Sequence, residues 1–173
     1  MSFELLPQHV CDLNSMCIQA VEQTLGFTLD NSPETLPLLD HYLRSHAETH
    51  AFEQHELLAV TAGSYFAQTL SLAFQGVHLD VPQENYEHWR VRLCDNLFCF
   101  NPVGLAHEVI RQDSMPGSHA HFEVHESYKE LAQACFEQWG MIRHEDFYTL
   151  SVRFECAEQL IVTLQKKGSK AAN

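Results

Sequence analysis

The hydrophobic pattern between residues 86 and 110 predicts a β-hairpin that leads directly into a helix. Apolar and polar side chains alternate in the first part of this stretch, which is typical of a strand with one buried face. Asp95 and Asn96 tolerate the positive φ angles that a two-residue hairpin turn requires. Asn101 is a favourable N-cap, and Pro102 is a favourable first residue, for the helix that follows.

A turn at Asp95 and Asn96 determines which hairpin residues face each other. The predicted pairs are Cys94 with Leu97, Leu93 with Phe98, Arg92 with Cys99, and Val91 with Phe100. One face is then apolar and is expected to contact the core: Trp89, Val91, Leu93, Phe98 and Phe100. The other face carries Arg90, Arg92, Cys94, Leu97 and Cys99. A shift by one residue would expose the aromatic face to water, so this register is strongly favoured.

Helical periodicity of the apolar residues predicts about six helices. The expected ranges are 8–25, a helix that begins at Pro33, 56–74, 102–111, 124–139 and 145–166. Gly63 interrupts the third helix at a cost of about 1 kcal/mol relative to alanine, which indicates that another element packs closely there. A short strand is expected from His78 to Val81.

These elements predict an α+β fold, mostly helical, with about six helices packed around a small three-stranded antiparallel meander. With 173 residues, of which 45% are hydrophobic, a single domain is the natural expectation. We expect residues 1–166 to form this domain and residues 167–173 to be a flexible tail.

The charge balance narrows the classes of partner. The chain has 23 acidic and 10 basic residues, for a formal net charge of -13. This charge disfavours direct binding to nucleic acids and to anionic membranes, and it permits a basic protein partner or mimicry of nucleic acid. No run approaches the ~20 apolar residues of a membrane span. The first residues lack the basic start of a signal peptide, so we expect a cytoplasmic protein.

Histidine is abundant, with 12 residues, and two clusters suggest metal binding. His46 and His50 would lie one turn apart on a continuous helix. In an extended segment, four residues share one face at a spacing of about 6.8 Å: His119, His121, Glu123 and His125. Their nitrogen and oxygen ligands suit zinc or another divalent transition metal. The alternative is an exposed loop that runs into the start of a helix.

Arg90 and Arg92 form a second candidate site, on the non-core face of the hairpin. Their guanidinium groups can receive an acidic ligand or partner, or can pair with local carboxylates. Cys94 and Cys99 share this face, where small residues under a covering helix are the simpler interpretation. The six cysteines include no C-x-x-C pair, and the chain has no nucleophile elbow, phosphate loop or dinucleotide fingerprint.

Three short motifs resemble a loosely defined family of small uncharacterised bacterial proteins. The motifs are LD-x-SPETL followed by LLD, then G-x-Y within a helix, then NPVG after a pair of strands. The match extends from about Leu29 to Ile110. Relatives often carry Gly-Glu where this chain has Ala67 and Gln68. The resemblance implies a bacterial, cytoplasmic, stand-alone domain. It does not imply any enzymatic reaction.

Three hypotheses about function follow. The leading one is a non-enzymatic binding protein, of the immunity or inhibitor kind, that neutralises a basic protein partner. The rival is a metal-dependent enzyme or metal sensor that uses His119, His121, Glu123 and His125. The third is self-association, as a homodimer, through an apolar helix face.

Overall fold

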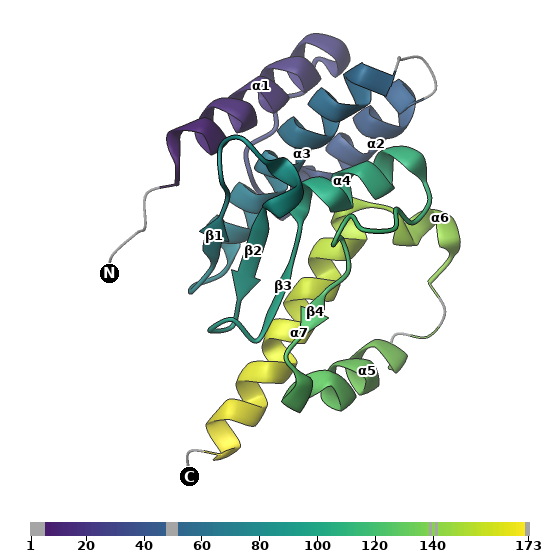
Figure 1. Ribbon diagram of the computed structural model, residues 1–173. Helices are drawn as coiled ribbons and strands as arrows, with labels where there is room; N and C mark the ends of the chain where they lie inside the picture. The colour runs from purple at the N-terminus through teal and green to yellow at the C-terminus, as the bar shows by residue number, and fades with distance from the viewer. Residues whose placement is uncertain (1–5, 48–51, 139, 141, 172–173) are drawn as a thin grey trace.

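The computed structural model describes residues 6–47, 52–138, 140 and 142–171 of this chain, and it is an α+β structure that is mostly helical (Figure 1). The α-helices are α1 Gln8–Leu25, α2 Leu36–Ala47, α3 Phe52–Ala73, α4 Pro102–Arg111, α5 Lys129–Glu137, α6 His144–Phe147 and α7 Leu150–Ala171. Short 3-10 helices are η1 Pro33–Thr35, η2 Tyr86–His88 and η3 Glu126–Tyr128. The strands are β1 His78–Asp80, β2 Arg90–Leu93, β3 Phe98–Phe100 and β4 Glu123–Val124.

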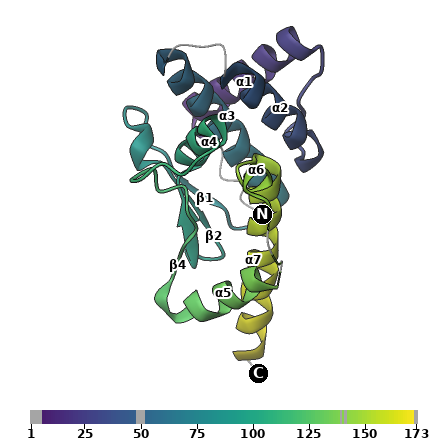
Figure 2. The ribbon, with the colours of Figure 1, turned by 90° about the vertical axis from the view of Figure 1, so that its right-hand side faces the viewer.

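The four strands form one antiparallel sheet in the order β1-β2-β3-β4. Figure 2 shows this sheet as one layer, with α7 on the opposite side of the molecule and α5 near their shared lower end. Aromatic side chains fill the space between the layers. Phe66 of α3 packs on Phe100 of β3 with ring centroids 6.1 Å apart. Phe74, which follows α3 directly, stacks on Phe154 of α7 at 5.2 Å.

The predicted hairpin register is confirmed. Val91 pairs with Phe100, Arg92 with Cys99, and Leu93 with Phe98. Asp95 and Asn96 have φ angles of 54° and 66°, as a two-residue turn requires. The five apolar side chains of the predicted core face, residues 89, 91, 93, 98 and 100, are all buried.

Several details of the predicted fold were wrong. A fourth strand, β4, extends the expected three-stranded meander, and the helix predicted over 124–139 begins only at Lys129. The ring of His125 accepts a hydrogen bond from the Ser127 amide, so a 3-10 turn precedes the helix. Residue 139, the predicted end, lies outside the described residues.

The last predicted helix, over residues 145–166, is divided into α6 and α7. The buried carboxylate of Asp40, from α2, accepts hydrogen bonds from the amides of Leu150 and Ser151 at 2.6 and 3.1 Å. This carboxylate caps the start of α7, so the chain begins a new helix there. α7 then continues to Ala171, into the segment for which the sequence predicted a flexible tail.

Gly63 marks a close contact between α3 and α4, as predicted. A Cβ atom at this position would lie 2.8 Å from Cα of Val103 in the first turn of α4. Gly104 makes a similar contact on the other side of α4, where a Cβ would lie 2.1 Å from the carbonyl oxygen of Ser118. The absence of side chains therefore allows α3, α4 and the following loop to stack closely.

A buried ion pair fixes the loop between α4 and β4. Glu108 of α4 and Arg153 of α7 are 3.2 Å apart, and both side chains are almost fully buried. The same carboxylate accepts hydrogen bonds from the Met115 amide at 3.0 Å and from the Ser118 hydroxyl at 3.3 Å. These contacts satisfy a buried charge that would otherwise destabilise the fold.

Asn101 connects β3 to α4 and to two further segments. Its side-chain oxygen accepts hydrogen bonds from the amides of Val103 and Gly104, which caps α4 as predicted. Its side-chain nitrogen donates to the carbonyl oxygens of Tyr86 and Glu87 in η2. Its backbone amide donates to the carbonyl oxygen of His119 at 2.7 Å. Asn101 is buried, so water cannot replace these bonds.

None of the helices within the described residues is both long enough and apolar enough to cross a membrane.

We expect Asn101→Ala to lower the free energy of unfolding by about 2–4 kcal/mol, because it leaves the buried amides of Val103 and Gly104 without their cap and removes the two bonds to η2. Asn85→Ala is the matched control. Asn85 caps only the short η2, at an exposed position, and should cost less than about 1 kcal/mol. Urea denaturation monitored by circular dichroism measures both values. Similar small losses in the two variants would contradict the role of Asn101.

Candidate functional site on the outer face of the sheet

One row of paired residues crosses all four strands on the face of the sheet that points away from the core. His78 pairs with Arg92, Arg92 with Cys99, and Cys99 with Glu123. Directly paired residues of antiparallel strands lie on the same face, so these four side chains are neighbours. We call this surface the outer face. It brings Arg90 and Arg92 together with Glu123, although they are far apart in the sequence.

The two arginines are held by different contacts, and that of Arg92 is weak. Arg92 lies 3.4 Å from the carboxylate of Asp80, and the two side chains are 40% and 62% exposed. An exposed ion pair of this kind contributes about 0–1 kcal/mol. Arg90 donates instead to the backbone carbonyl oxygens of Trp89 and Glu87, at 2.7 and 3.0 Å. Their guanidinium groups therefore remain near the surface, beside Cys99.

A cysteine, a glutamate and a histidine meet at the β4 side of the outer face. The thiol of Cys99 donates to one oxygen of Glu123 at 3.8 Å. The other oxygen of Glu123 is 2.7 Å from the ring Nδ1 of His119. Burial, and then the charge of Glu123, raise the pKa of the Cys99 thiol, while Arg92 and Arg90 lower it. The raised pKa keeps this thiol protonated near neutral pH.

This arrangement differs from that of a cysteine nucleophile. Catalytic thiols are activated by a neighbouring imidazole or by a cationic environment that lowers their pKa. Here the carboxylate of Glu123 stands between the sulfur of Cys99 and the ring of His119. It stabilises the protonated thiol rather than the thiolate. The cluster is therefore suited to hydrogen bonding and charge recognition.

The four predicted metal ligands have different neighbours in the structure. His119 and Glu123 contact each other, as stated above. His121 is exposed, and the ring of His125 caps η3. Across the described ranges, no group of three or more His, Cys, Asp or Glu side chains is arranged to hold a metal ion.

The other predicted histidine cluster is only partly visible. The ring of His46 lies 2.9 Å from the carbonyl oxygen of Tyr42 in its own helix. His50 lies outside the described residues.

The predicted face of the hairpin did not include Glu123, which β4 adds to the outer face. The signal for β4 is the apolar alternation of Ala120, Phe122 and Val124, which are buried or half-buried in the structure. Polar residues occupy the positions between them, so Glu123 points to the outer face. This period-2 pattern, read as a strand, predicts that Glu123 lies on the face opposite to the apolar side chains, but it does not predict that β3 is the neighbouring strand.

Comparisons with protein-family models, with curated proteins and with solved structures found no match to this chain.

The reactivity of Cys99 should respond to the charges around it. Glu123→Gln removes a negative charge, which lowers the pKa of the thiol and should speed its alkylation by iodoacetamide at about pH 8 by roughly three- to tenfold. Arg92→Gln removes a positive charge and should slow the reaction. Peptide mass spectrometry measures the rate at each cysteine.

The alkylation of Cys94 in the same samples is the internal control. Burial and the charge of Asp95 raise the pKa of Cys94, so neither substitution should change its rate much. If both variants accelerated the reaction of Cys99, the cause would be greater exposure rather than charge.

Proposed function

We propose that this protein is a non-enzymatic binding protein for a basic protein partner, of the immunity or inhibitor kind, and that the outer face of the sheet contacts that partner. The observation that carries the proposal is the outer face itself. It presents charged side chains of both signs on a sheet whose other face packs on helices. Its ion pair is weak enough to be exchanged for contacts with another protein.

The distribution of charge supports a basic partner. Among the described acidic residues, only Asp40 and Glu108 are buried, and Arg153 neutralises Glu108. The excess of 13 negative charges therefore lies mainly at the surface. Such a surface accelerates the encounter with a basic protein, while contacts of both signs on the outer face would select the correct orientation.

The chemistry of the cluster around Cys99 also favours binding over catalysis. The Cys99 thiol is protonated and donates a hydrogen bond to the carboxylate of Glu123. The same carboxylate also contacts the ring of His119. Asp80 and Glu123 offer acceptors for a partner's lysine or arginine. Arg90 and Arg92 offer donors for a partner's carboxylate.

The alternative is a metal-dependent enzyme or metal sensor, and the contact between His119 and Glu123 favours it. Zinc bound at this pair would be lost in His119→Ala. Mass spectrometry of protein dialysed against zinc measures the metal content, and equal zinc in the variant and the wild type would contradict a site at these residues.

The test of the binding proposal is affinity capture from extracts of the organism that makes the protein. Asp80→Lys reverses one charge on the outer face, and Glu158→Lys makes the same change at an exposed position of α7 as a matched control. We expect the wild type and Glu158→Lys to recover a stoichiometric basic protein, and Asp80→Lys to lose most of it. Recovery of no such protein, or equal recovery by both variants, would contradict the proposal.

A further inference from the structure

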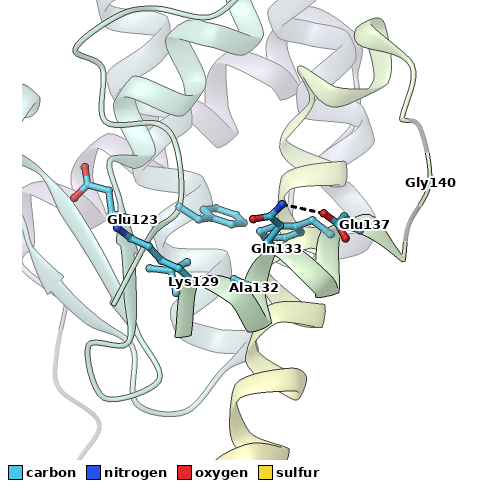
Figure 3. A pocket seen from close by; sticks show the side chains of 9 residues that line it. Glu123, Lys129, Ala132, Gln133, Glu137 and Gly140 are labelled. Carbon is cyan, nitrogen blue, oxygen red and sulfur yellow. Dashed lines mark hydrogen bonds between the residues drawn. The ribbon is translucent and has the colours of Figure 1, made fainter. Parts of the chain in front are cut away.

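A surface groove lies between β4, the last strand of the sheet, and α5 (Figure 3). Its volume is about 920 Å³. Phe122 and Val124 supply the apolar lining from the strand, and Ala132 and Phe136 supply it from the helix. The rings of Phe122 and Phe136 are 6.3 Å apart. The groove thus combines an apolar lining with one strand of the sheet along its length.

The edge of β4 is open along this groove. In an antiparallel ladder, the backbone groups of alternate residues point to the same neighbouring strand. The amide of His125 donates to the carbonyl oxygen of Leu97 at 2.7 Å, and Glu123 pairs with Cys99. Residues 123 and 125 therefore face β3. The backbone groups of Phe122 and Val124 point the other way, toward a position where a further strand would lie.

The groove has an acidic rim. Glu137 is exposed and accepts a hydrogen bond from Gln133 at 2.9 Å, as the dashed line in Figure 3 shows. Glu123 lines the opposite side, on β4. The one lysine in the lining, Lys129, is paired with Glu126. The rim therefore complements positive charge rather than negative charge.

We propose that this groove binds an extended, basic segment of the partner protein, which pairs with the open edge of β4 as a fifth strand. The proposal rests on the proposed function and names the chemistry of the partner. Alternate side chains of the segment would lie on Phe122 and Phe136, and cationic side chains on its other face would lie beside Glu123. Glu137 would attract the positive charge of the segment from the α5 side of the groove. Backbone pairing supplies affinity in this mode of recognition, and alternate side-chain positions supply specificity.

The first test uses a defined probe, a seven-residue acetylated and amidated peptide of alternating lysine and valine. We expect isothermal titration calorimetry to show saturable binding. We also expect NMR to show that the bound peptide slows hydrogen exchange at the amide of Val124. Glu137→Lys should weaken binding by roughly tenfold, while Glu158→Lys, an equal charge change on α7, should leave it within about twofold. Absence of binding, or equal loss in the two variants, would overturn the proposal.

The second test separates strand pairing from attraction between charges. One probe carries N-methyl groups on its lysine residues and another carries them on its valine residues. Because alternate amides point to opposite edges of a strand, one of these peptides should lose binding and the other should retain it. Equal binding of both would show that the backbone of β4 takes no part, and would overturn the proposal.

The two proposals fail in different ways. If a partner is captured and depends on Asp80, but the peptide does not bind the wild-type protein, the outer face remains the binding surface and only the groove is rejected. If the peptide binds at the groove but no partner is captured, the groove recognises extended basic segments and the proposed function is rejected.

Discussion

The hydrogen bonds of Asn101 join the sheet to the helix cluster. Asn101 follows β3, and its buried side chain caps α4 and binds η2, while its backbone amide donates to the carbonyl oxygen of His119. A sheet and a helix cluster can pack in many orientations, because apolar contacts are not directional. Hydrogen bonds are directional, and a buried group that loses its partner costs about 1–3 kcal/mol. The bonds of Asn101 therefore favour one orientation of the sheet relative to the helices. The bond to His119 also holds the chain where β4 can pair with β3.

The segment between α4 and β4 shows how an irregular loop becomes part of the core. Its backbone approaches Gly104 so closely that any side chain there would collide with Ser118. Glu108 holds the same loop through Met115 and Ser118, and its charge is balanced by Arg153. Loops usually lie at the surface because their backbone groups need water. Here the buried carboxylate of Glu108 accepts the hydrogen bonds that water would otherwise accept. The loop leads into β4, and both the outer face and the groove include residues of that strand.

The parts of the fold that depend on local chemistry were predictable. The hairpin register follows from the alternation of residues and from Asp95 and Asn96, and the start of α4 follows from Asn101. β4 was missed because it has only two residues and is stabilised by contacts with distant residues, notably the bond from His125 to Leu97. The outer face could be predicted as far as the hairpin extends. The addition of Glu123 to it required a pairing between strands that no turn connects.

The capping of α7 by Asp40 has a consequence for the order of folding. The carboxylate and the amides it binds are separated by 110 residues or more along the chain. Contacts of such long range form late, because closing the intervening loop costs entropy before the contact repays it. The helix cluster of α1, α3 and α4 can assemble from shorter-range contacts. Thr149 caps the Val152 amide locally, whereas the amides of Leu150 and Ser151 gain their partner only when α2 is in place. The start of α7 is therefore stabilised fully only after the N-terminal helices have assembled.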